Sequence, residues 1–162
     1  VTDGAARTAL LAKEHIDTDG PLLIVNSDQI LNPDHWDVDA FLHHAGPRDG
    51  CIVTFTADHP KWSYVVRDGA FVVEVVEKRV VSDEATCGIY YWRRGSDFVR
   101  CAEQMIAKDI RTNGEFYIAP TYNELIAEGA DIMPYVIPSS AMHGLGTPED
   151  LEAYLATQKV GQ

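Results

Sequence analysis

The chain has 162 residues, of which 46% are hydrophobic and 23% charged, as expected for one globular domain with its own core. Its formal net charge of −12 disfavours nucleic acid or an anionic membrane surface as a partner, although a local phosphate site is compatible with it. The apolar runs are strand-sized, so we expect no transmembrane helix.

Cysteine usage indicates the redox environment. Cys51, Cys87 and Cys101 lie in apolar or helical patterns, and their spacing does not suggest zinc. An odd number of such cysteines indicates buried free thiols in a reducing compartment, so a cytoplasmic protein is expected. The first residues resemble neither a signal peptide nor a transit peptide.

The first third of the chain alternates helix and strand signals. Residues 5–16 show apolar positions at helical spacing. The apolar run 22–25, which stops at polar residues, predicts a buried parallel strand over residues 22–26. A second helix is expected over residues 36–45 and a second strand over residues 51–57.

A hairpin dominates the middle of the chain. Residues 64–67 and 70–77 flank an Asp-Gly pair, which supplies the positive φ that a two-residue turn needs. Residues 86–92 predict another strand. A helix over residues 96–110 follows, with Ser96 as its predicted N-cap and an apolar inner stripe.

The last third adds short elements and a final helix. A helix is expected over residues 122–127, and a strand over residues 132–137 that Pro134 restricts to a sheet edge. Thr147 and Pro148 predict the N-cap and first position of the last helix. Alternating strands and helices with one hairpin predict an α/β fold, with a mixed, mostly parallel sheet flanked by helices.

Asp28 is the first candidate site residue. It lies just past the end of the strand predicted over residues 22–26, and open α/β folds bind ligands at the carboxyl edge of their strands. A carboxylate there can hold Mg²⁺ against phosphate oxygens. The alternative is that Asp28 only caps the following turn.

Glu77 and Lys78 end the second hairpin strand. Side chains alternate faces along a strand, but both can turn toward one ligand at a fraying end. A Glu accepts hydrogen bonds from sugar hydroxyls, and a Lys is a point charge for a phosphate. The alternative is a solvated strand terminus.

Two glycine-containing segments precede predicted helices. Gly4 enters the first helix, where a small residue lets a base or phosphate approach backbone amides, although ordinary helix entry explains it too. Residues 143–148 lack the lysine of a P-loop and the spacing of a dinucleotide motif. A tight loop before a capped helix explains them, and His143 is left as a residue that can face a ligand.

The order of these segments resembles the sugar-phosphate nucleotidylyltransferases, the NTP-transferase enzymes of the nucleotide-diphospho-sugar (GT-A-like) fold. The resemblance covers nearly the whole chain and rests on a series of short segments: Gly4-Ala5-Ala6-Arg7-Thr8-Ala9-Leu10-Leu11-Ala12, Asn26-Ser27-Asp28-Gln29, Val75-Val76-Glu77-Lys78, Ala85-Thr86-Cys87-Gly88-Ile89-Tyr90-Tyr91, Gly114-Glu115-Phe116-Tyr117-Ile118-Ala119-Pro120-Thr121-Tyr122-Asn123 and Gly144-Leu145-Gly146-Thr147-Pro148-Glu149-Asp150-Leu151.

The resemblance implies that a sugar-1-phosphate attacks an NTP and that pyrophosphate leaves. It gives roles to six residues: Asp28 holds Mg²⁺, Lys78 neutralises the sugar phosphate, Glu77 binds sugar hydroxyls, Gly4 lies against the nucleobase, Gly88 leaves room beside the sugar, and Tyr117 helps to shape the sugar pocket. NTP and sugar-1-phosphate are therefore the expected partners.

The chain departs from the family pattern in two places. The family begins with a strand and a glycine-rich loop carrying Arg and Lys that wraps the triphosphate, and residues 1–162 contain no such segment. Many members also place a second metal carboxylate where Gly144 and Leu145 stand, while Glu149 and Asp150 are interpreted as first-turn helix acids. The chain therefore resembles the rear part of one catalytic domain, truncated at its N-terminus, with little or no turnover expected.

Two other function classes stay open. One is a non-catalytic domain that binds sugar phosphates or serves oligomerisation, and the other is a metal-dependent glycosyltransferase, disfavoured because Asn26-Ser27-Asp28 has one acid instead of an Asp-x-Asp. Central strands absent from the chain would leave unpaired edges, so a homo-oligomer or strand exchange is expected.

Overall fold

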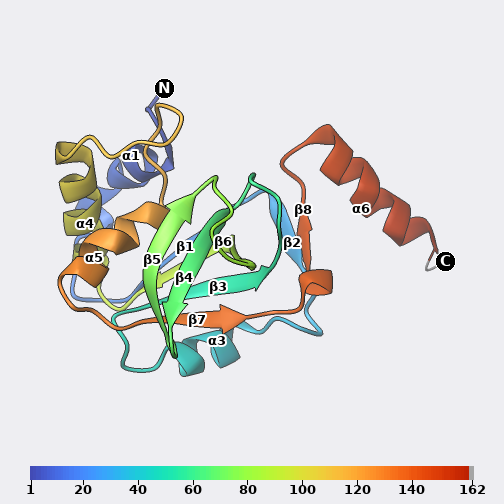
Figure 1. The fold of residues 1–162 in the computed structure, drawn as a ribbon, viewed down its shortest axis with the longest axis horizontal. Helices are drawn as coiled ribbons and strands as arrows, with labels where there is room; N and C mark the ends of the chain where they lie inside the picture. The colour runs from blue at the N-terminus through green and yellow to red at the C-terminus, as the bar shows by residue number, and fades with distance from the viewer. Residues whose placement is uncertain (161–162) are drawn as a thin grey trace.

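The computed structural model describes residues 1–160, which form a mixed six-stranded sheet, a separate two-stranded sheet and helices around them (Figure 1). The larger sheet has the order β5-β4-β6-β3-β7, and β1 also pairs with β6. Its strands are β1 (Leu22–Val25), β3 (Gly50–Thr56), β4 (Ser63–Asp68), β5 (Phe71–Glu77), β6 (Glu84–Trp92) and β7 (Ile132–Val136).

The smaller sheet joins two distant segments. It pairs β2 (Gln29–Leu31) with β8 (Met142–Gly144) in antiparallel register. The helices are α1 (Ala5–Leu10), α2 (Lys13–Ile16), α3 (Val38–Ala45), α4 (Gly95–Ala107), α5 (Tyr122–Ala127), α6 (Pro148–Val160) and the 3₁₀ turns η1 (Ala119–Thr121) and η2 (Ser139–Ala141). Within residues 1–160, no helix is long and apolar enough to cross a membrane.

The predicted α/β class and mixed sheet are confirmed, but the prediction of a mostly parallel sheet was wrong. Only β3 and β7 pair in parallel among the described strands, and the other pairings are antiparallel. Strand β1 is neither parallel nor fully buried: it pairs with β6 alone, and Leu23 and Val25 are 38% and 51% exposed. An unbroken apolar run cannot distinguish a central strand from one that hydrogen-bonds on a single side.

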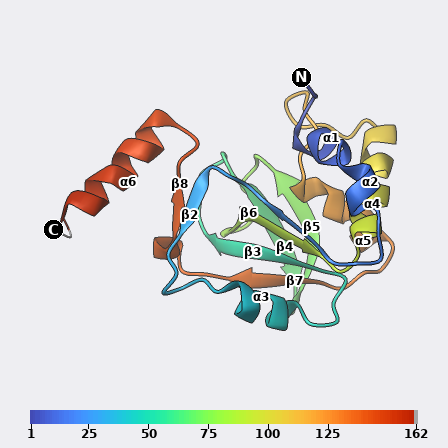
Figure 2. The ribbon, with the colours of Figure 1, turned by 180° about the vertical axis from the view of Figure 1, so that it is seen from behind.

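Two apolar cores cover the faces of the larger sheet. Ile52 and Trp92 face the core shared with α4 and α5, whereas Val53 and Ile89 face the core closed by α3. This alternation follows from the two-residue period of a strand. Seen from behind, α1, α2 and α4 lie together at one end of the sheet, and α6 extends away from the opposite end (Figure 2).

The first predicted helix is interrupted. The amides of Leu11 and Ala12 donate to carbonyls three residues back, at 3.1 and 3.0 Å, so the chain makes a tighter turn between α1 and α2. Leu11, an apolar residue within the predicted helix 5–16, is consequently 77% exposed.

Helix α4 begins one residue earlier than predicted, and Ser96 is not its N-cap. The amides of Gly95 and Ser96 donate to the carbonyls of Gly20 and Thr18, at 2.9 and 3.0 Å, so the distant turn between α2 and β1 takes the place of a capping side chain. The helix ends at Ala107, before Asp109 with its φ of +53°.

Other predictions agree with the structure. Helix α5 has the predicted bounds, β7 lies at the sheet edge, and the Asp150 amide donates to Thr147 Oγ1 at 3.1 Å, as expected of an N-cap. All three cysteines are buried free thiols.

Candidate functional site

A cavity of about 490 Å³ opens where the end of β1, the start of β4, the end of β5, the middle of β6 and the start of α6 converge. Asp28, Glu77 and Lys78 all line it, together with Gly88 and Tyr117. The structure thus brings five of the six predicted site residues into one cavity, from segments that are up to 89 residues apart.

Asp28 lies in the turn between β1 and β2. Its carbonyl accepts a hydrogen bond from the Leu145 amide at 2.7 Å, which ties the turn to the segment before α6. Its carboxylate rests against Gly146, where an added Cβ would lie 2.8 Å from Asp28 Oδ2. Within residues 1–160 this carboxylate has no hydrogen-bond or ion-pair partner, so the expected alternative of a turn cap is not observed.

Glu77 is held at the end of β5 by its cross-strand partner. Ser63 is opposite Glu77 in the β4–β5 ladder, and its hydroxyl donates to Glu77 Oε2. Burial raises the pKa of Glu77, while the bond from Ser63 and the nearby charge of Lys78 act in the opposite direction. Glu77 is therefore part of the cavity wall and not a solvated strand end.

Lys78 reaches the same cavity because the chain leaves the strand at this residue. Its φ is +53°, and its amide donates to the Trp62 carbonyl at 3.0 Å. Its ammonium donates to the Tyr117 hydroxyl and lies 4.5 Å from that ring's centroid. The bond to Tyr117 is the main cause of the raised pKa of Lys78, so the side chain is charged at neutral pH.

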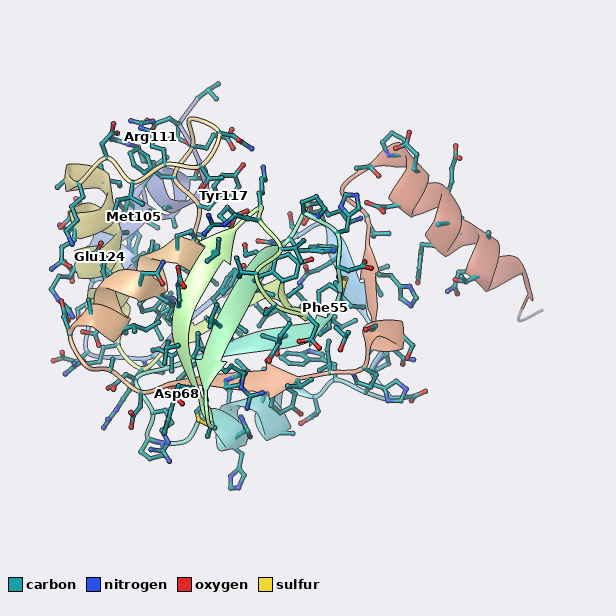
Figure 3. All side chains as sticks on the ribbon, viewed as in Figure 1. Phe55, Asp68, Met105, Arg111, Tyr117 and Glu124 are labelled. Carbon is teal, nitrogen blue, oxygen red and sulfur yellow. The ribbon has the colours of Figure 1, made fainter. Side chains whose placement is uncertain are left out.

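Tyr117 belongs to the loop before η1, where it lies above the sheet (Figure 3). Its hydroxyl donates to Glu115 at 2.7 Å while accepting from Lys78. Backbone bonds anchor this loop to the N-terminal segment: the Phe116 amide donates to Asp3 at 2.9 Å and the Ala6 amide to Phe116 at 3.0 Å.

Gly4 is the predicted site residue that does not line the cavity. It has a φ of +123°, and an added Cβ would lie 2.4 Å from the Phe116 carbonyl oxygen. The lack of a side chain lets the N-terminal segment pack against this loop, and the neighbouring Ala5 lines the cavity instead.

Gly88 lines the cavity, but a neighbour fills the space beside it. Its φ is +79°, and an added Cβ would lie 2.4 Å from Asn26 Nδ2. The Asn26 amide nitrogen of the backbone donates to the Gly88 carbonyl at 2.9 Å. Gly88 therefore allows the Asn26 side chain to lie flat on β6 at the cavity wall.

Several lining residues were missed in the sequence. Asn26, Ser63 and Lys61 line the cavity, and so does Asp150, which was interpreted only as a first-turn helix acid. Asn26 and Asp150 stand in segments that carry the family resemblance, but the local sequence predicts no site role for any of the four, because each contacts a partner that is distant along the chain. His143 instead packs against Tyr154, with ring centroids 5.2 Å apart and the ring planes tilted by 53°, and lies outside the cavity lining.

The side chains of the cavity offer few ligands for the expected Mg²⁺. Within residues 1–160, no group of three or more His, Cys, Asp or Glu side chains is placed to hold a metal ion. Mg²⁺ is commonly bound through one or two carboxylates, with phosphate oxygens and water completing its coordination. Asp28 fits that kind of site, since its carboxylate lines the cavity without a protein partner.

Comparison with known proteins shows the fold through solved structures. No family model matches the chain, and no curated protein matches its sequence. The crystal structure of the nucleoside-diphosphate-sugar pyrophosphorylase from Vibrio cholerae RC9 is 28% identical, with a TM-score of 0.81, over 96% of this chain and 66% of that one.

Two further structures extend the likeness at lower identity. UDP-glucose pyrophosphorylase complexed with UDP-glucose is 16% identical, with a TM-score of 0.79, over 98% of this chain and 63% of that one. The inositol-1-phosphate CTP transferase from T. maritima is 11% identical, with a TM-score of 0.68, over 99% of this chain and 63% of that one. The chain spans 63–66% of the length of these three proteins. It shares its fold with nucleoside-diphosphate-sugar pyrophosphorylases and related nucleotidyltransferases.

Proposed function

We propose that the cavity binds a sugar-1-phosphate and an NTP and joins them with release of pyrophosphate. The observation that supports this most is the convergence of Asp28, Glu77 and Lys78 on one cavity. A carboxylate free to hold a cation, a buried acceptor and an ammonium match the needs of phosphate and sugar recognition. The shared fold agrees with a reaction of this kind.

In the proposed reaction, an oxygen of the sugar phosphate attacks the α-phosphorus of the NTP. The bond to the β-phosphate breaks, and pyrophosphate leaves. This chemistry depends mainly on positioning and charge neutralisation. Mg²⁺, when bound at Asp28, would supply positive charge at the phosphate oxygens.

Binding of the sugar phosphate, the sugar hydroxyls and the nucleobase is assigned to residues of the chain itself. Lys78, held by Tyr117 and Glu115, presents its ammonium to the sugar phosphate. Glu77 accepts from sugar hydroxyls with the oxygen that Ser63 leaves free. Gly88 and Tyr117 shape the sugar pocket, and we place the nucleobase near the segment that begins with Gly4.

A nucleotide-binding experiment tests the metal assignment. We expect NTP to raise the melting temperature in the presence of Mg²⁺ and this shift to disappear in Asp28→Asn. Asp34→Asn is the matched control, because Asp34 is also exposed but lies outside the cavity. An unchanged shift in Asp28→Asn would reject Asp28 as the metal-binding residue.

Turnover is tested separately with CTP, UTP, GTP or dTTP and a panel of sugar-1-phosphates, by measuring pyrophosphate release. Residues 1–162 contain no glycine-rich segment with Arg and Lys, so we propose that they turn over slowly or not at all by themselves. Rapid release would refute that impairment. Saturable sugar-phosphate binding without any Mg²⁺-dependent thermal shift on addition of NTP would instead favour the non-catalytic binding domain.

A further inference from the structure

Lys61 carries a second positive charge of the cavity that the proposed roles leave unused. It precedes β4, and its ammonium lies 4.7 Å from the centroid of the Trp62 ring. The same Nζ atom donates to Asp150 Oδ1 and Oδ2 at 3.1 and 3.3 Å. Lys61, Trp62 and Asp150 all line the cavity that contains Asp28.

The segment before α6 brings this ion pair close to Asp28. Gly146 contacts the Asp28 carboxylate, and an added Cβ at Gly144, two residues earlier, would lie 3.8 Å from Asp150 Oδ2. Both carboxylates therefore border the same short stretch of backbone. A phosphate positioned at Asp28 by a cation would lie on the side of the cavity where the Lys61 ammonium is found.

The charge balance of the cavity favours a role for Lys61 beyond pairing. Three carboxylates, from Asp28, Glu77 and Asp150, line it together with the ammonium groups of Lys61 and Lys78. Lys78 is already bound to Tyr117, at the end of the cavity near Glu77. Lys61 is thus the lining cation available to a second anionic group.

The ion pair between Lys61 and Asp150 can open easily, so that Lys61 can bind another anion. The two side chains are 41% and 28% exposed, and ion pairs with this exposure contribute little to stability. A lysine ammonium on a flexible four-carbon chain can also reach a phosphate without movement of the backbone.

We propose that Lys61 is a second phosphate-binding residue of the cavity, which exchanges Asp150 for a phosphate group held beside Asp28. This inference rests on the proposed function, because it adds a residue to the same site. The competing explanation is a purely structural tether, in which the pair only attaches the start of α6 to the segment before β4.

The two explanations predict different results for the two partners. If Lys61 binds phosphate, removal of its charge weakens anion binding, whereas removal of the Asp150 charge leaves it unchanged or tightens it. If the pair is only a tether, both substitutions break the same bond and act alike. Weaker binding in the Lys61 variant, together with unchanged or tighter binding in the Asp150 variant, therefore identifies the phosphate-binding role.

The experiment measures the Kd of inorganic pyrophosphate for the whole chain by titration calorimetry, at fixed Mg²⁺ and low salt. We expect Lys61→Met to weaken binding about tenfold, the effect of losing one charged hydrogen bond. Lys61→Arg should restore most of the affinity, and Asp150→Asn should bind at least as tightly as the wild type. Lys13→Met is the matched control, since Lys13 pairs with Glu103 at 2.6 Å, away from the cavity lining.

Three outcomes would overturn the inference: no pyrophosphate binding by the wild type, equal weakening in Lys61→Met and Asp150→Asn, or equal weakening in Lys61→Met and Lys13→Met. Circular dichroism and melting temperature confirm that each variant is folded. Failure of this inference can be distinguished from failure of the proposed function. Weaker binding in Lys61→Met but not in Asp150→Asn, without nucleotidyl transfer, would support the phosphate site alone, whereas turnover with an unaffected Lys61→Met would support the function alone.

Discussion

Helices α4 and α6 have the same length, 13 residues each, but opposite relations to the core. Seven residues of α4 are buried, among them Phe98, Cys101 and Met105. In residues 148–158 of α6 no side chain is buried, and only Asp150 and Tyr154 are half-buried. Apolar burial therefore holds α4 in place, whereas a capping bond and an ion pair hold the start of α6.

The cavity therefore has two walls that are held in place differently. We call the side formed by β5 and β6 the firm wall, and the side formed by the segment before α6 the soft wall. Strands β5 and β6, which carry Glu77 and Gly88, belong to the sheet that α4 and α5 cover, and Lys78 directly follows β5. Met105 and Glu124 mark these two helices beside the sheet in Figure 3. The segment before α6, which contacts Asp28, lies on the opposite side and depends on polar contacts.

The largest expected effect tests the firm wall. Phe98→Ala should cost about 3–5 kcal/mol of unfolding free energy, because Phe98 is fully buried and the substitution leaves a cavity. Leu155→Ala on α6 should cost less than about 0.5 kcal/mol, because Leu155 is 48% exposed. Urea denaturation followed by circular dichroism measures both, and a large loss for Leu155→Ala would show that α6 packs on a partner.

A smaller effect is expected from the cap of α6. Thr147→Ala removes the acceptor of the Asp150 amide, which should destabilise the helix by about 1 kcal/mol. Because α6 is hardly packed, the loss should be local. Amide hydrogen exchange should quicken in α6 while the urea midpoint of the chain stays unchanged. A lower midpoint would mean that α6 is coupled to the core.

The two walls also predict opposite titrations of their carboxylates. Burial raises the pKa of Glu77, whereas hydrogen bonds from Lys61 lower the pKa of Asp150. Ionised Glu77 therefore opposes folding at neutral pH, and this cost disappears as the pH falls below its unfolded pKa. Asp150 instead favours folding above its unfolded pKa, and that contribution is lost as the pH falls through its folded pKa.

Glu77→Gln should accordingly raise the unfolding midpoint slightly at neutral pH, while it weakens sugar-phosphate binding. Carbon NMR titration of the two carboxyl groups checks the directions of the pKa shifts. If Glu77 titrates within or below its ordinary range, or if Glu77→Gln destabilises the chain, the assignment of Glu77 to a desolvated wall is wrong.

The smallest effect on folding concerns the edge of β1. We propose that this edge, where Leu23 and Val25 are exposed, supports self-association. Val25→Lys should weaken it, because charges on an edge strand oppose pairing with another chain, and should change unfolding by less than about 0.5 kcal/mol. Light scattering across a concentration series measures self-association, and a strictly monomeric wild type would contradict the proposal.

Much of the fold could be predicted from local patterns. The Asp-Gly turn located the hairpin because few residues accept its positive φ, and Gly69 indeed has a φ of +57°. Pro134 placed β7 at an edge because it lacks an amide to donate. By contrast, the direction of β1 and the break at Leu11 depend on partners that the local sequence does not specify.

Local patterns likewise predicted only part of the candidate site. Asp28, Glu77 and Lys78 were found because each stands at the end of an apolar run, where a strand must stop. Ser63, Lys61 and Asp150 could not be predicted in this way. In the local sequence Ser63 is an ordinary strand residue, Lys61 a surface lysine and Asp150 an acid in the first turn of a helix. Only their contacts across the cavity give them a role.

The amino-acid sequence by itself determined where most of the strands and helices form, since periodicity, turn residues and caps act over a few neighbouring positions. The tertiary structure alone decided the strand directions, the packing of the Asn26 side chain into the space beside Gly88, and the approach of Lys61 and Asp150 to Asp28. Those features depend on contacts between residues tens of positions apart, whose free energy is gained only once the sheet and both cores have assembled.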